Sequence, residues 1–184
     1  GYVTVAFPVS QQPVKELPNV SPPYVRPELL FVDENGEVQD RTDVLGILVQ
    51  RLEKQDNKAF LKELSPNELG VVFAINDVKT ISAAFAEHHA RINAGDILVS
   101  LKRLDRFAIV DPDTKHLKKL ISGPWRMPSD PDPLSNGNLL VFSGKSPETD
   151  QNGSKVIEFD PVKNETVWAY PASPKHVLMS REWG

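Results

Sequence analysis

Residues 123–142 read Gly-Pro-Trp-Arg-Met-Pro-Ser-Asp-Pro-Asp-Pro-Leu-Ser-Asn-Gly-Asn-Leu-Leu-Val-Phe, and the predicted fold depends most on this stretch. Its first half is rich in proline, which fixes φ and lacks an amide proton, so we expect an ordered loop and neither a helix nor a central strand. Asn136-Gly137 tolerates positive φ and predicts a tight turn, and the apolar run 139–142 predicts a strand. A loop rich in Asp, Arg and Trp that leads into a strand suits a binding or reacting group.

The composition is that of an ordinary folded protein, with 184 residues of which 40% are hydrophobic and 25% charged. The formal net charge of −4 argues against a surface for nucleic acid or anionic membrane. No apolar run reaches membrane-spanning length. The absence of cysteine excludes disulfides, thiolate metal sites and cysteine nucleophiles. The chain starts at Gly1 without a basic and then apolar leader, so we expect a fragment or a processed product.

The N-terminal part predicts two segments. Residues 1–27 hold a β-like run, Tyr2–Phe7, among many prolines, which predicts one edge strand and an extended connector. From residue 28 to 184 we expect a single β domain. It starts with a hairpin over 28–40, whose turn is Asp33-Glu34-Asn35-Gly36.

Two helical insertions are expected in this domain, near 44–64 and 81–92. Apolar residues recur at helical spacing over 44–54 behind a possible cap at Thr42 or Asp43, and a second short helix from 57 to 64 would end before Pro66. The segment 81–92 is rich in alanine.

Two later passages look like an internal repeat. Gly95-Asp96-Ile97-Leu98-Val99 lies 42 residues before Gly137-Asn138-Leu139-Leu140-Val141, and Asp111-Pro112 lies 49 residues before Asp160-Pro161. Strands are expected at 97–100, 106–110, 117–121, 139–142, 155–159 and 166–170. Periods of 40–50 residues built from short strands are typical of a β-propeller. With the 28–40 hairpin as a weaker copy, we predict a mainly β fold, a partial β-propeller of about three blade-like repeats.

Seven short motifs, taken in order, resemble the arylsulfotransferase (aryl-sulfate sulfotransferase) propellers. They are Ile75-Asn76-Asp77, 95–101, 108–114, Gly123-Pro124-Trp125-Arg126, Asp130-Pro131, Asn136-Gly137-Asn138 and Val167-Trp168. The resemblance covers about residues 70–171 and extends more weakly to 28. It implies a propeller with a central channel, periplasmic or secreted. In that channel a histidine takes a sulfuryl group from a phenolic sulfate ester and passes it to a phenol.

The resemblance also implies which positions are functional. The family's histidine directly before Asp-Pro falls on Ser129, a second histidine falls on Ala74, and an arginine falls on Lys102. Such a site needs a neutral imidazole as nucleophile and cationic or hydrogen-bond-donating neighbours, and requires no metal or cofactor. Lys102 keeps the charge of the arginine without its bidentate fork. The matching catalytic positions are therefore Ser129 and Lys102, and the substrate-binding candidates are Asn76, Trp125, Arg126 and Asp130.

Several of these residues have a structural alternative. Trp125 and Arg126 could grip an aromatic sulfate by stacking and charge, or Trp125 could pack under the loop. Asp130 and Asp132 are too few for a calcium cage, so loop capping is favoured. The adjacent His88 and His89 point in different directions, which favours solvated or core-edge roles over displaced catalytic bases. The remaining histidines, His116 and His176, are expected at the surface.

The leading functional hypothesis is sulfuryl transfer from a phenolic sulfate ester to a phenol acceptor, by a divergent site or with residues outside this chain. The alternative is a catalytically silent propeller that binds an anionic or aromatic ligand or a protein partner. A third hypothesis is carbohydrate or protein recognition by a generic propeller. The expected partner is a small phenol or aryl sulfate, without nucleic acid or membrane insertion.

Overall fold

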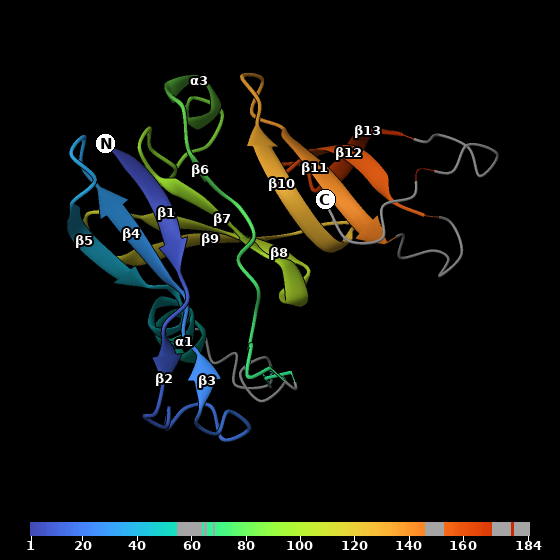
Figure 1. Ribbon diagram of the computed structural model, residues 1–184. Helices are drawn as coiled ribbons and strands as arrows, with labels where there is room; N and C mark the ends of the chain where they lie inside the picture. The colour runs from blue at the N-terminus through green and yellow to red at the C-terminus, as the bar shows by residue number, and fades with distance from the viewer. Residues whose placement is uncertain (55–63, 65, 68, 146–152, 171–177, 179–184) are drawn as a thin grey trace. The chain divides into compact units, whose positions relative to one another are not determined.

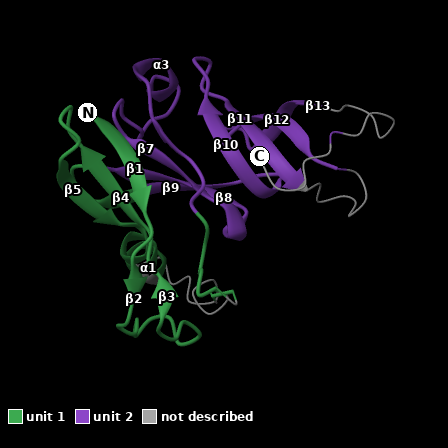
Figure 2. Ribbon diagram, in the orientation of Figure 1, with its two compact units in different colours: residues 1–74, 112–117 green, residues 75–111, 118–184 purple. Residues whose placement is uncertain are grey.

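The computed structural model describes residues 1–54, 64, 66–67, 69–145, 153–170 and 178. Within these residues the fold is mainly β, as predicted, and consists of four small antiparallel sheets (Figure 1). The chain divides into two compact units (Figure 2). Unit 1 holds residues 1–74 and 112–117, and unit 2 holds residues 75–111 and 118–184.

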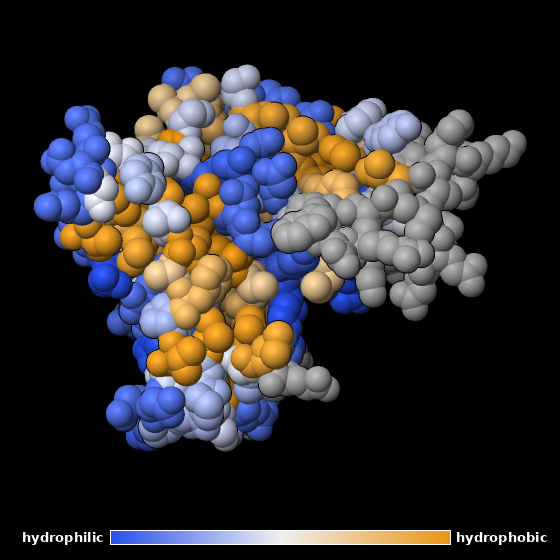
Figure 3. Space-filling view, in the orientation of Figure 1, coloured by the Kyte–Doolittle hydropathy of each residue, from blue (hydrophilic) through white to orange (hydrophobic). Residues whose placement is uncertain are grey.

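Unit 1 contains a three-stranded sheet, a two-stranded sheet and one helix. The first sheet has the order β1-β4-β5, with β1 at Tyr2–Ala6, β4 at Glu28–Val32 and β5 at Val38–Asp43. The second sheet pairs β2 (Val9–Ser10) with β3 (Tyr24–Val25). The predicted edge strand and the hairpin over 28–40 are thereby confirmed. Figure 3 shows hydrophobic surface over this part of unit 1. Phe7 and Val9 are among its exposed hydrophobic residues.

The helix α1 (Val44–Lys54) confirms the helix predicted over 44–54 and buries Val44, Leu45 and Leu48. The residues predicted to cap it, Thr42 and Asp43, are the last two residues of β5, which runs directly into the helix. The Asp43 carboxylate forms an ion pair of 2.6 Å with Arg26, and a cap at this position stays a prediction. The hydroxyl of Thr42 is buried without a hydrogen-bond partner. The short helix predicted over 57–64 lies, apart from Leu64, outside the described residues.

Unit 2 is built around two four-stranded meanders, each with its strands in chain order. The first contains β6 (Val78–Thr80), β7 (Ile97–Leu101), β8 (Arg106–Asp111) and β9 (His116–Ser122), the first two residues of β9 being assigned to unit 1. The second contains β10 (Arg126–Pro133), β11 (Leu139–Lys145), β12 (Lys155–Asp160) and β13 (Glu165–Tyr170). All six strands predicted in the repeat are confirmed. The described sheets close into neither a barrel nor a propeller, so the number of blades stays a prediction.

The repeat extends to backbone conformation. The turns between β8 and β9 and between β12 and β13 have the same length, and each ends in a left-handed residue, Lys115 (φ 57°) and Asn164 (φ 60°). Gly95 (φ 93°) and Gly137 (φ 84°) lie at the same distance before β7 and β11. The two sequence copies are thus also structural copies.

One apolar core serves both meanders of unit 2. Trp125 lies between Phe107 of β8 and Phe159 of β12, with ring centroids 5.1 Å and 5.0 Å away. The same cluster includes Phe85, from the single-turn helix α3 (Ala83–Ala86). Large aromatic side chains contribute much of the apolar area in a core of this kind. Trp125 therefore anchors the entry to β10 in that core.

The loop predicted over the proline-rich stretch is wrong for residues 126–133, which form β10. Prolines fit this strand because it lies at a sheet edge and pairs only with β11. It also carries a register shift between Ser129 and Asp132, and Met127 and Asp130 have φ values of 47° and 46°.

The helix predicted over 81–92 is wrong for most of its length, since only Ala83–Ala86 is helical. The Ser82 hydroxyl caps this turn by accepting from the Phe85 amide. After Glu87 the backbone changes to short turns, in which the His88 amide bonds the Phe85 carbonyl and the His89 amide the Ala86 carbonyl. Contacts of these two histidines with a distant turn override the helical propensity of the segment.

Candidate functional site

The candidate site is built where β6 and β10, the first strands of the two meanders, meet. The entry to β6 is fixed by Asp77. One carboxylate oxygen, Oδ1, accepts from the Val78 amide at 2.9 Å, and the Asp77 carbonyl accepts from the Ser100 amide at 3.1 Å. The approach to β6 is therefore held against β7.

A buried hydroxyl joins the segment before β6 to β10. The Ser100 Oγ atom on β7 lies 2.7 Å from Asn76 Oδ1 and 3.1 Å from the Pro128 carbonyl oxygen, and it can donate to either acceptor. Asn76 was predicted as a binding residue. Here it is an acceptor within a network that ties three strands together.

Lys79 on β6 contacts three carboxylates. Its Nζ atom lies 3.4 Å from Asp77, 3.2 Å from Asp130 and 3.3 Å from Asp132. These four residues, called here the β6–β10 cluster, have a formal net charge of −2. Sequence reasoning identified the two aspartates of β10 but missed Lys79. The signal available was the spacing of Asp77 and Lys79, since alternate residues of a strand lie on one face.

The residues of the β6–β10 cluster shift one another's pKa values. Burial lowers the pKa of the Lys79 ammonium, but hydrogen bonding to Asp130 and the charge of Asp77 more than offset it, so the pKa lies above its usual value. Burial raises the pKa of Asp77, and the negative charge of Asp130 adds to this rise, although Lys79 opposes it. The Asp77 Oδ2 atom is buried and has an ion-pair contact with Lys79 but no hydrogen bond. Lys79 is therefore a fully charged cation whose charge is already neutralised.

Ser129, the position that matches the family's histidine, lies within β10 and is fully buried. Its hydroxyl has no hydrogen-bond partner. Ser129 also lies between two residues with positive φ, Met127 and Asp130. Left-handed backbone at non-glycine residues costs roughly 1–3 kcal/mol and is often found at functional sites. The hydroxyl is thus buried and unpartnered in a strained part of the edge strand.

Two other predicted site residues, Trp125 and Arg126, contact Asp105 rather than Ser129. The Asp105 carbonyl accepts from Trp125 Nε1 at 3.1 Å, and its carboxylate accepts from Arg126 at 2.8 Å and from the Met127 amide at 2.6 Å. Trp125 is only 2% exposed, which matches the packing alternative. Lys102 begins the short 3₁₀ helix η1 (Lys102–Leu104), which packs against β10. The Ser129 hydroxyl nevertheless forms no hydrogen bond with Lys102.

The histidines lie elsewhere. His88 and His89 contact the β10–β11 turn, His116 is exposed at the start of β9, and His176 lies outside the described residues. Within the described part of the chain no histidine bonds Ser129, and no three or more His, Asp or Glu side chains are arranged to hold a metal ion. A serine nucleophile needs a base within hydrogen-bond reach, and Ser129 lacks one among these residues.

An open cavity of about 350 Å³ lies apart from the cluster, between the end of β9 and the turn before β13. Its lining consists of Ser122, Gly123, Pro124, Phe159, Asn164 and Thr166. These side chains carry no charge, so the cavity offers no ionic anchor. None of the helices that the structure describes is long and apolar enough to cross a membrane.

No protein-family model, curated protein or solved structure matches the chain. The chemistry of the site therefore has to be argued from its residues. The β6–β10 cluster can hold polar or charged groups between two strands. It lacks the imidazole and the unpaired cations that sulfuryl transfer requires.

Proposed function

We propose that the chain is part of an arylsulfotransferase-like β-propeller whose site binds a ligand or partner but no longer transfers sulfuryl groups. In this proposal the two meanders are successive blades, and the sheet β1-β4-β5 is a third, incomplete one. The equal turn lengths, the paired left-handed residues and the two matching glycines support a repeating architecture. The seven motifs that resemble the family lie mainly in these two sheets.

The functional part of the proposal rests on Ser129, which directly precedes Asp130 of the negatively charged β6–β10 cluster. The first strand of each meander contributes to the β6–β10 cluster, as expected of the strands that line the channel of a propeller. Ser129 on β10 falls where the family has its histidine, and its hydroxyl has neither a base nor a hydrogen-bond partner. Covalent transfer through imidazole is therefore absent at this position.

The charge of the cluster also disfavours a sulfate ester. Transfer requires cations or donors on the sulfate oxygens, whereas Lys79 is already bound by three carboxylates. Like charges about 4 Å apart repel by about 1 kcal/mol in water and about 4 kcal/mol near a protein surface. A neutral or hydrogen-bonding ligand, or a protein partner, suits this site better than a free aryl sulfate.

Sulfuryl transfer itself is the second candidate, and Lys79 is the observation that favours it. Its ammonium lies between β6 and β10. A site that transfers a sulfuryl group needs such a positive charge next to the sulfate oxygens. Rearrangement of the two β10 aspartates would make that charge available.

A turnover assay with a chromogenic aryl sulfate and a phenol acceptor tests the proposal. The parent chain is compared with a Ser129→His variant and with a Ser122→His control, in which the added histidine lies at the end of β9, outside the β6–β10 cluster. Circular dichroism checks the fold of each. We expect no turnover by the parent or by the control.

Activity gained only by Ser129→His supports a sulfotransferase-like site that has lost its nucleophile. Turnover by the parent overturns the proposal in favour of the second candidate. Where both variants are folded and silent, calorimetry with the same aryl sulfate separates the remaining hypotheses. Weak binding that Asp130→Asn strengthens supports the family-derived site, and no binding by either protein favours a generic propeller.

A further inference from the structure

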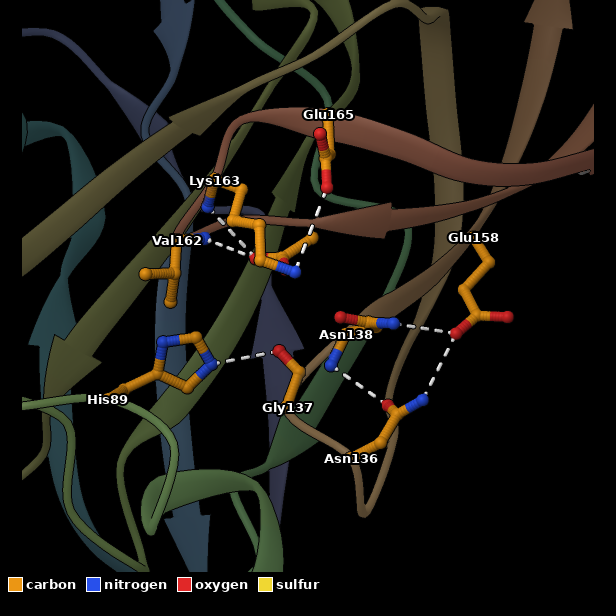
Figure 4. Close-up of polar contacts among 9 residues, drawn as sticks. His89, Asn136, Gly137, Asn138, Glu158, Val162, Lys163 and Glu165 are labelled. Carbon is orange, nitrogen blue, oxygen red and sulfur yellow. Dashed lines mark hydrogen bonds and ion pairs between the residues drawn. The ribbon is translucent and has the colours of Figure 1, made fainter.

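Two adjacent histidines hold the turn between β10 and β11. In Figure 4 the His89 ring points at the carbonyl of Gly137, with Nε2 2.9 Å from the oxygen. His88 Nε2 lies 3.2 Å from the Ser135 carbonyl oxygen. A carbonyl oxygen only accepts, so each Nε2 carries a proton and donates it. The segment after α3 thus binds one turn at two neighbouring points.

The same turn is bonded to itself and to β12. The Leu134 amide donates to the Asn138 carbonyl at 2.9 Å, and the Gly137 amide donates to the Leu134 carbonyl at 3.0 Å. The side chains of Asn136 and Asn138 both donate to Glu158, at 3.1 Å and 2.7 Å (Figure 4). Because the turn length fixes the register of a hairpin, these contacts set the position of β10 against β11.

The histidines pack tightly on this turn. A Cβ atom at Gly137 would lie 2.4 Å from the Cβ atom of His88, and Gly137 also has a φ of 84°. His89 is 7% exposed, and its ring lies 4.4 Å from that of Phe85, a residue of the core. The His89 contact can therefore open only if a buried imidazole leaves its apolar neighbour.

We propose that His88 and His89 form a pH-sensitive latch, which holds the β10–β11 turn at neutral pH and releases it when His89 takes up a second proton. In the closed state the neutral imidazole of His89 donates to Gly137. The second proton turns it into a buried cation. Opening exposes that cation to water and loosens β10, the strand that carries Ser129, Asp130 and Asp132.

The surroundings of His89 oppose its protonation on balance. Burial is the largest cause that lowers the pKa of His89, and Lys119 on β9 and the neighbouring His88 lower it further. The Gly137 carbonyl and Asp160 at the end of β12 act in the opposite direction. Asp160 is partly neutralised by its ion pair with Lys163, 3.1 Å away.

The sign of the pH effect follows from this lowered pKa. The open state, with an ordinary histidine pKa near 6.5, binds more protons than the closed state. The stabilisation by the latch is therefore complete above 6.5 and declines as the pH falls below that value.

Hydrogen exchange of backbone amides in residues 134–140 tests the latch. Protection factors, corrected for the intrinsic rate, are compared at about pH 7.5 and about pH 5, with β7 as an internal reference. We expect a several-fold loss of protection in acid, confined to the turn and β10. His89→Gln keeps a donor for the Gly137 carbonyl but cannot titrate, so it should stay protected at both pH values. His116→Gln, at an exposed histidine, should behave like the parent.

The latch is refuted if the parent shows no acid-dependent loss, or if His89→Gln shows the same loss as the parent. Should His89→Gln fail to fold, the imidazole signals of the parent can be titrated by NMR. Loss of protection that follows the titration of His89 supports the latch. Protection that stays constant while His89 titrates overturns it.

Discussion

The two meanders of unit 2 share a topology but differ in their first and last strands. In the first sheet β7 is buried along its whole length, and β6 is a first strand of only three residues. In the second sheet β10 has eight residues, a bulge and two left-handed positions, while β13 is mostly exposed. The last three strands of each sheet and the turns between them carry the repeated motifs. The candidate site lies instead on the first strands, which are the least alike.

The residues that maintain the fold are therefore different from those that determine the chemistry of the candidate site. Repeated residues such as Gly95 and Gly137 meet a backbone requirement that is the same in both sheets. Edge strands have fewer pairing constraints, so they can accommodate prolines, bulges and unshared charges. A site on β6 and β10 can therefore change its chemistry without disturbing the strands that hold the sheets together.

The largest loss of stability is expected when Trp125, the aromatic side chain that packs between the two sheets, is removed. Trp125→Ala should lower the free energy of unfolding by about 3–5 kcal/mol, because the ring is buried between Phe107 and Phe159. Trp168→Ala on β13 is the matched control. That ring is 49% exposed and stacks on Tyr170, so the loss should stay below about 1 kcal/mol. Urea denaturation measures both, and equal losses would contradict the placement of the core.

The contrast between repeated and unrepeated strands explains which elements could be predicted from the sequence and which could not. Strands β7, β8, β11 and β12 were predicted because apolar runs and turn residues report local backbone preferences. β10 was predicted as a loop because its three prolines outweighed its other residues, and only its position at an edge makes a strand possible. The helix over 81–92 was overestimated because propensity ignores the contacts of His88 and His89 with residues 47 and 48 positions away.

The next prediction compares the two equivalent glycines. Gly137→Ala places a methyl group 2.4 Å from His88 and strains a φ of 84°, so we expect a loss of about 2–3 kcal/mol. Gly95→Ala strains a similar φ of 93° but meets no atom within 4 Å, so the loss should be about 1–2 kcal/mol. Thermal unfolding of both variants gives the difference. A larger loss at Gly95 would show that the turn around Gly137 can relax away from His88.

The candidate site was only partly predictable, for a related reason. Asn76, Ser129 and Asp130 were found by resemblance, and the structure places them on β10 or on the segment that enters β6. Lys79 was missed because its one local signal, the alternate spacing with Asp77, says nothing about its partners on β10. Asp130 and Asp132 lie more than 50 residues further along the chain, and sequence separation of that kind hides charge neutralisation. Trp125 and Arg126 lie where β10 begins and both bond Asp105, which no sequence pattern had singled out.

The smallest expected effect is on the affinity for an aryl sulfate, when the negative charge of the β6–β10 cluster is reduced. The double variant Asp130→Asn, Asp132→Asn removes the two carboxylates that β10 contributes and leaves Lys79 paired with Asp77 alone. The cluster then changes from a formal net charge of −2 to 0. Because these side chains are partly exposed, we expect affinity for an aryl sulfate to rise only about fivefold to tenfold, or about 1 kcal/mol. Isothermal calorimetry at low salt measures the change, with the double variant Glu34→Gln, Glu37→Gln, at two exposed residues of unit 1, as the matched loss of two charges. An equal gain in this control would mean that net charge alone controls binding. A gain in affinity that is confined to the β10 double variant and lost at high salt would mean that the two aspartates of β10 keep anions away from Lys79. It would also mean that Lys79 on β6 still supplies the cation that anion binding requires.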